Sequence, residues 1–160
     1  MFVLDADHLV ILQKRSGTDF ANLLRRLSQY EPSAFFVTIV SFHELIGGWQ
    51  QYLSRATSSD AVVRGYRKLE TIIGDFAKAQ VLPFSGAAAH IFDDLRKQRV
   101  RVATMDLRIG SVAIANRMTV LTRNTVDFQR IPNLSFEDWT VASAHDHATG
   151  NGTGSGDENQ

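Results

Sequence analysis

The chain has 160 residues, 44% of them hydrophobic, so it can bury one sizeable core but is short for two full domains. Seventeen basic and seventeen acidic residues give a net charge of zero, which excludes an overall positive field, so any contact with a polyanion must be local. The lack of cysteine excludes disulfides and thiolate metal sites. The N-terminus has no basic leader, and no apolar run could cross a bilayer, so we expect a cytoplasmic protein without a membrane partner.

Short apolar runs alternate with stretches of helical period over residues 1–142, which is typical of an α/β domain with a mainly parallel sheet. We expect strands at residues 2–4, 35–40, 81–84 and 119–122, and a short fifth near 135–136 or 139–141. The apolar spacing predicts helices near residues 20–27, 45–52, 62–76, 87–98 and 106–118, with the second and third forming a hairpin. Residues 143–160 have almost nothing to bury, so we expect a disordered polar tail.

Acidic residues from separate parts of the chain fall at one end of the predicted sheet, where parallel α/β sheets bind ligands. These positions follow strands or open helices: Asp5, Asp7, Glu44, Asp106, Asn124 and Asp127. Several carboxylates in one pocket repel one another, and Mg²⁺ or Mn²⁺ would relieve that repulsion. Such a site suits in-line hydrolysis of a phosphodiester by a metal-activated water.

Each acid also has a structural explanation. The segment from Ser41 to Glu44 matches a capping box, in which Glu44 reaches back to the amide of Ser41. Capping a helix or closing a turn would suit the others, namely Asp7, Asp106 and Asp127. Asp5 is the hardest to explain by capping, because a carboxylate at the end of a buried strand needs a charged partner or a metal.

A basic run precedes Asp106, and a further arginine follows the strand at 119–122. These residues are Arg96, Lys97, Arg99, Arg101 and Arg123. They have two interpretations: a solvated helix end, or side chains that hold RNA phosphates beside the acids.

Three segments resemble PIN domains, and most of all the VapC-type toxins of type II toxin-antitoxin pairs. They read Leu4-Asp5-Ala6-Asp7-His8-Leu9, Ser41-Phe42-His43-Glu44-Leu45, and Asp106-Leu107-Arg108-Ile109 running to Val120-Leu121-Thr122-Arg123-Asn124-Thr125-Val126-Asp127-Phe128. The ending Arg130-Ile131-Pro132-Asn133-Leu134, then Glu137-Asp138-Trp139, is typical of the VapC branch. The similarity covers about residues 1–140.

The resemblance implies a three-layer α/β/α fold and a Mg²⁺- or Mn²⁺-dependent endoribonuclease that a cognate antitoxin holds inactive. Matched position by position, Asp5, Glu44 and Asp106 correspond to the metal-binding acids. We assign Asp127 as the fourth acid, with Asn124 as a neutral second candidate for that place. We also expect a homodimer, by resemblance and because aromatic helical faces leave apolar surface to cover.

Two alternatives use the same residues. Ala6 stands where many members have Thr or Ser, and together with Asn124 it favours a catalytically weak PIN-like module that binds or regulates. The acids would equally serve a structure-specific DNA nuclease. The sequence leaves open the RNA target, the antitoxin and the number of metals.

Overall fold

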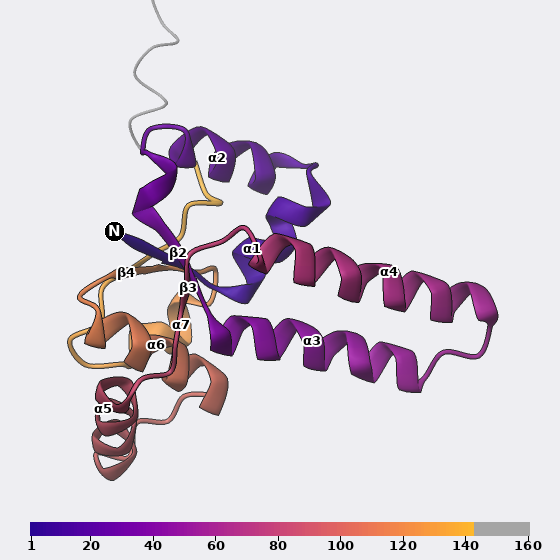
Figure 1. Ribbon diagram of the computed structural model, residues 1–160. Helices are drawn as coiled ribbons and strands as arrows, with labels where there is room; N and C mark the ends of the chain where they lie inside the picture. Colours follow the sequence, from indigo (N-terminus) through magenta and orange to yellow (C-terminus); the bar gives the residue numbers. More distant parts are fainter. Residues whose placement is uncertain (143–160) are drawn as a thin grey trace, which may run out of the picture.

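The computed structural model describes residues 1–142 (Figure 1). The expected tail, 143–160, lies outside the described residues. The elements in chain order are β1 (Phe2–Leu4), α1 (Ala6–Lys14), α2 (Thr18–Leu27), the 3₁₀ turn η1 (Pro32–Ala34), β2 (Phe35–Thr38), α3 (Ile39–Ser54), α4 (Ser59–Phe76), β3 (Val81–Leu82), α5 (Gly86–Lys97), α6 (Thr104–Ala115), β4 (Thr119–Leu121), α7 (Thr125–Phe128) and β5 (Phe136–Glu137).

All five strands are parallel and lie in the order β3-β2-β1-β4-β5. The chain first adds β2 and β3 on one side of β1 and then places β4 on the other side. The strand order therefore reverses between β1 and β4, and sheets of this kind bind ligands at such a reversal, in the crevice beyond the carboxyl ends of the strands. Leu4 lies beside Leu121 in this pair, so the residues that follow, Asp5 and Thr122, emerge together.

Alternate strand residues face opposite layers of helices. Val3 and Val120 lie in a core with side chains of α5 and α6, whereas Leu4, Leu121 and others pack against α1 and α2. Burying each of these side chains contributes roughly 2 kcal/mol of transfer free energy. Two apolar layers on a parallel sheet give the three-layer α/β/α architecture expected from the sequence, so that expectation is confirmed.

Helices α3 and α4 form an antiparallel hairpin, called the arm below, which projects from the sheet (Figure 1). Leu45 of α3 and Ile72 of α4 pack with Ala6 of α1 at its base. Nearer the tip the two helices approach so closely that a Cβ at Gly65 would collide with Leu53. The hairpin expected from the apolar spacing is therefore present.

The structure differs from the sequence expectations mainly at the end of β2. The β-branched residues Ile39 and Val40 were expected in the strand but form the first turn of α3. Thr38 ends β2 and caps α3, its Oγ1 accepting from the backbone N–H of Ser41 at 2.9 Å. A buried cap of this kind outweighs the strand propensity of two residues.

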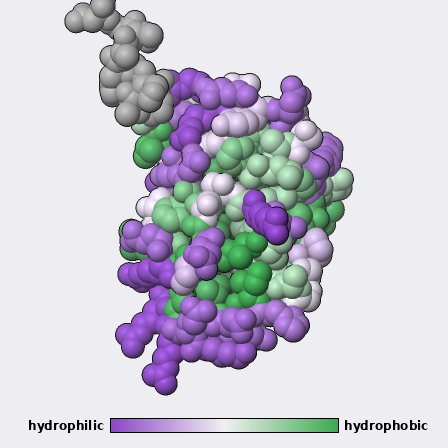
Figure 2. Space-filling view, turned by 90° about the vertical axis from the view of Figure 1, so that its left-hand side faces the viewer, coloured by the Kyte–Doolittle hydropathy of each residue, from purple (hydrophilic) through white to green (hydrophobic). Residues whose placement is uncertain are grey.

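No helix within residues 1–142 is long and apolar enough to cross a membrane. On the side that faces away from the arm, hydrophobic side chains gather in the middle of a hydrophilic surface (Figure 2).

Candidate active site

Asp5 lies where β1 passes into α1, at the reversal of strand order, and is 5% exposed. It is the N-cap of α1: its Oδ1 accepts from the backbone N–H of Ala6 at 2.7 Å. The sequence made Asp5 the acid hardest to explain by capping, yet in the structure it does cap a helix. Burial, followed by the charge of Asp7, raises the pKa of Asp5 from 3.8 to about 7. Ionised Asp5 is thus costly in the protein alone, although one capping bond stabilises it.

Thr122 holds the other oxygen of Asp5. Its hydroxyl is fully buried and donates to Asp5 Oδ2 at 2.9 Å while accepting from the backbone N–H of Asn124 at 3.0 Å. Sequence reasoning missed this residue. The signal was present, because Thr122 is the last residue of the strand expected at 119–122 and so falls at the end of the sheet where the acids were expected. It supplies Asp5 with a side-chain hydroxyl, which the neighbouring Ala6 cannot do.

Glu44 lies in the second turn of α3, because the helix begins at Ile39 rather than near Ser41. The capping-box interpretation was wrong, since Thr38 caps the helix instead. Among the described residues, the Glu44 carboxylate makes no hydrogen bond or ion pair. Burial raises its pKa, and the charges of Asp106 and Asp7 add to the effect. Glu44 is thus an acid without a structural partner that lies within electrostatic reach of two others.

Asn124 joins two further acids. Its Nδ2 donates to Asp106 Oδ2 at 2.9 Å and to Asp127 Oδ2 at 3.1 Å. Asp106 lies in the first turn of α6, where burial and then the charge of Asp127 raise its pKa. Asp127 also pairs through Oδ1 with Arg130 at 3.1 Å. The Asn124 amide therefore bridges two carboxylates that still repel each other, and Arg130 is a second neighbour that sequence reasoning missed.

Asp7, a secondary candidate from the sequence, acts through its charge on three of the other acids. Its charge raises the pKa of Asp5, Glu44 and Asp106. Asp7 Oδ2 accepts from the backbone N–H of Arg123 at 2.8 Å, and Oδ1 contacts Nδ1 of the fully buried His8 at 2.7 Å. These bonds fix Asp7 at the mouth of the crevice.

The name acid cluster is used below for the carboxylates brought together here, namely Asp5, Asp7, Glu44, Asp106 and Asp127. Their carboxylate oxygens and their mutual repulsion fit a hard divalent cation, which would lower the raised pKa values. Within residues 1–142, no three His, Asp or Glu side chains are gathered closely enough to surround a cation in their present conformations. The charges are coupled, but the oxygens do not converge on one point.

The five basic residues proposed for RNA are not brought together. Arg96 lies over the ring of Phe92, and Lys97 pairs with Asp94 at 3.0 Å. Arg123 pairs with Asp19 at 3.4 Å. The remaining two lie on the connection between α5 and α6: Arg99 has a left-handed backbone, and the carbonyl of Arg101 accepts from Arg130. Within residues 1–142, two of the five are linked to the acid cluster, and both through the backbone: the N–H of Arg123 donates to Asp7, and the carbonyl of Arg101 accepts from Arg130, which pairs with Asp127.

No established family profile matches the chain. Among curated proteins, it is 40% identical over 58 residues to "Ribonuclease VapC" of Rickettsia bellii, a match covering 34% of this chain and 43% of the relative. It is 33% identical over 67 residues to "Ribonuclease VapC2" of Rickettsia felis, covering 39% of this chain and 50% of the relative. The matched stretches thus span about half of the curated relatives or less.

Among solved structures, VapBC-1 from nontypeable Haemophilus influenzae superposes with a TM-score of 0.67 at 22% identity, covering 88% of this chain and 98% of that chain. VapBC2 from Rickettsia felis, bound to a promoter DNA fragment, gives a TM-score of 0.62 at 22% identity, over 86% and 98%. The likeness to VapC-type proteins expected from the sequence motifs is confirmed, in sequence over part of the chain and in fold over most of it.

Proposed function

We propose that this chain is a metal-dependent endoribonuclease and the toxin component of a toxin-antitoxin pair. One observation carries the proposal: carboxylates from separate segments of the chain are electrostatically coupled at the point where strand order reverses. A protein keeps such repulsion only where it serves a purpose, because neutral residues would cost less. The curated relatives named as ribonucleases and the solved VapBC complexes support the choice of activity and partner.

In this proposal Asp5, Glu44 and Asp106 hold Mg²⁺ or Mn²⁺, with Asp127 as the fourth acid. The cation supplies Lewis acidity and neutralises charge on the phosphodiester. Thr122 keeps the Asp5 carboxylate oriented, and the Asn124 amide spaces Asp106 from Asp127. Arg130 pairs with Asp127 and places a positive charge beside it, while the same guanidinium donates to the backbone carbonyl of Arg101. The protein itself contributes orientation and a partly buried site for the scissile phosphate.

Partners follow from the same proposal. RNA is the substrate, and an antitoxin would cover the crevice. We also propose a homodimer, for which the apolar area facing away from the arm offers surface (Figure 2). Light scattering of the purified protein tests this, and a monomer at micromolar concentration would contradict it.

The direct test is cleavage of labelled RNA and DNA oligonucleotides of the same sequence. We expect RNA cleavage with Mg²⁺ or Mn²⁺ and none with EDTA. Asp5→Asn or Asp106→Asn should lower the rate at least about 100-fold. Asp93→Asn on the exposed surface of α5 is the matched control and should leave the rate unchanged.

Cleavage that survives EDTA or Asp5→Asn would overturn the mechanism. Faster cleavage of DNA would favour the DNA nuclease alternative. Tight RNA binding without any cleavage would favour the binding module, for which the neutral Asn124 is the specific structural argument.

A further inference from the structure

The arm carries a concentration of basic and aromatic side chains that the acid cluster does not explain. From residue 45 to residue 69 the chain has four Lys and Arg residues against one acid, although its overall net charge is zero. The four are Arg55, Arg64, Arg67 and Lys68, and within residues 1–142 none of them forms an ion pair. Their charge is therefore available to an external anion.

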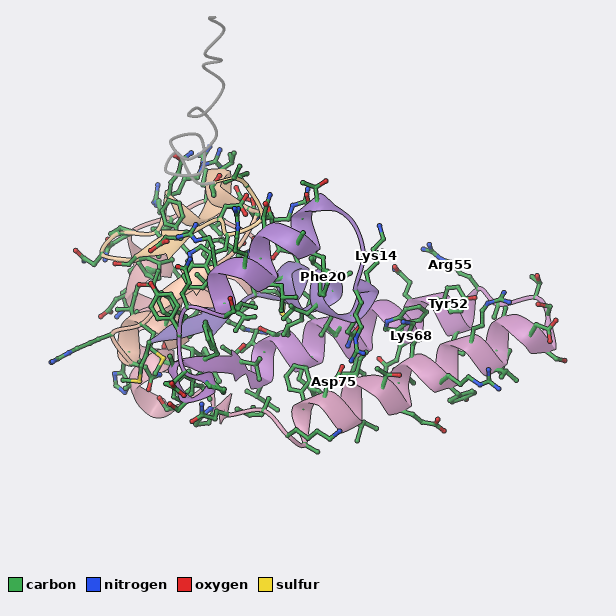
Figure 3. All side chains as sticks on the ribbon, turned by 90° about the horizontal axis from the view of Figure 1, so that it is seen from above. Lys14, Phe20, Tyr52, Arg55, Lys68 and Asp75 are labelled. Carbon is green, nitrogen blue, oxygen red and sulfur yellow. The ribbon has the colours of Figure 1, made fainter. Side chains whose placement is uncertain are left out.

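Three adjoining hollows run along the arm. The middle one, about 290 Å³, is lined by Trp49, Tyr52, Arg64, Arg67, Lys68 and Thr71, with no acid among them. It shares Tyr52 with a hollow of about 370 Å³ nearer the tip, which Gly48, Gln51 and Arg55 also line. Towards the sheet it shares Lys68 and Thr71 with a hollow of about 400 Å³ against α1. Tyr52, Arg55 and Lys68 gather along the arm, with Asp75 at its inner end (Figure 3).

The same surface leads back to the acid cluster. Glu44, Gly48, Gln51 and Arg55 follow one another at steps of four, three and four residues, so they share one face of α3. Arg55 lies about 16 Å along the helix from Glu44, at a rise of about 1.5 Å per residue. A Cβ at Gly48 would meet nothing within 4 Å, so this face of the helix is open at the residue that follows Glu44 by one turn. A strand leaving the acid cluster along this face meets no side chain at Gly48.

We propose that the arm binds the flank of a single-stranded RNA whose scissile phosphate lies at the acid cluster, an inference that rests on the proposed function. Arg64, Arg67, Lys68 and Arg55 contact phosphates, and the rings of Trp49 and Tyr52 contact bases. Cationic side chains beside aromatic rings are the combination that binds single strands with little sequence preference. The side chain of Asp75 is engaged by Gln13 Nε2 at 2.8 Å, which limits its repulsion at the inner end.

The inference is tested by fluorescence anisotropy with a labelled single-stranded RNA, using the full chain in EDTA so that no cleavage occurs. Replacing Arg64, Arg67 and Lys68 together by Gln should raise the Kd at least tenfold. It should also reduce the slope of log Kd against log salt by about 2, since each phosphate contact on a single strand contributes about 0.7. Arg117→Gln, just beyond the C-terminal end of α6, is a control that removes one positive charge away from the arm and should keep the wild-type Kd.

Two further pairs of variants test the contact between Tyr52 and the bases and the route of the RNA past Gly48. Tyr52→Leu should weaken binding about fivefold or more. Tyr66→Leu, at a more exposed tyrosine on the far face of α4 from Arg64 and Lys68, should leave binding unchanged. Gly48→Glu, which places a carboxylate on the path, should weaken binding, whereas Gly48→Ala should retain it. Circular dichroism of each variant confirms that the fold is kept.

The outcomes separate this inference from the proposed function. Wild-type cleavage together with unchanged RNA affinity in the arm variants would overturn the inference and leave the function standing. RNA binding that depends on the arm, in a protein that does not cleave RNA, would support the inference and overturn the proposed function. If the arm variants lose a co-expressed antitoxin while their RNA affinity is unchanged, the arm is a protein interface and the inference is wrong.

Discussion

Asp5→Asn is expected to stabilise the metal-free protein while abolishing cleavage. Asp5 titrates near 3.8 in an unfolded chain, but burial and the charge of Asp7 raise its pKa to about 7 in the folded protein. The folded state therefore binds this proton more tightly than the unfolded state. Stability from this group is complete below about pH 4, is lost as the pH rises towards 7, and stays low above it.

The magnitude follows from the two pKa values. Each pH unit between them corresponds to 1.36 kcal/mol, so ionising Asp5 costs at most roughly 4 kcal/mol at pH 8. Asparagine is neutral at every pH and keeps an acceptor for the backbone N–H of Ala6. Its amide nitrogen cannot accept from the Thr122 hydroxyl as Asp5 Oδ2 does, and this loss offsets part of the gain. Because water and ions relax around a real site, we expect the variant to gain about 2 kcal/mol at pH 8 and almost nothing at pH 4.

Urea denaturation in EDTA at both pH values measures this difference. The comparison isolates Asp5, because the charge of Asp5 is not among the causes that raise the pKa of Glu44 or of Asp106. If Asp5→Asn is no more stable than the wild type at pH 8, or if the gain is the same at pH 4, then folding does not raise the pKa of Asp5.

Three further results are expected. At pH 8, Mg²⁺ or Mn²⁺ should raise the thermal midpoint of the wild type and should raise that of Asp5→Asn much less. Differential scanning fluorimetry measures both midpoints, and equal shifts would argue against Asp5 as a ligand. Thr122→Val should lower the free energy of unfolding by about 1–3 kcal/mol and reduce cleavage, because its buried hydroxyl serves both Asp5 and the Asn124 amide. Thr38→Ala should cost about 1 kcal/mol in urea denaturation while Glu44→Gln costs nothing in EDTA; the opposite order would restore the capping-box interpretation.

The apolar periodicity predicted most of these elements because apolar and polar residues lie on separate faces of the helices and the strands are short apolar runs. The run at 2–4 and the run at 119–122 each became a buried strand, and the steps from Val62 to Phe76 gave α4. Boundaries were harder. Ser41 and Glu44 carry a genuine capping pattern, yet Thr38 starts the helix three residues earlier. Which of two competing caps is used depends on the burial of Thr38, which only the assembled sheet determines.

The acids were found because each follows a strand or opens a helix, and that placement can be read in one dimension. Their partners could not be found in the same way. The Asn124 amide bridges Asp106 and Asp127 only because the first turns of α6 and α7 lie close together in the folded protein. The basic residues show the same limit: the sequence located the charges of Arg96 and Lys97, but their neighbours Phe92 and Asp94 on α5 are known only from the structure, and their role in binding RNA stays a prediction.

The direct junction of β2 and α3 has a mechanical consequence. Thr38 is the last residue of the strand and Ile39 the first of the helix, so no loop residues separate them. On this side the arm is therefore joined to the sheet without an intervening flexible loop. Glu44 lies near this junction on α3, so a tilt of the arm as a rigid body would also move Glu44 relative to Asp5 and Asp106.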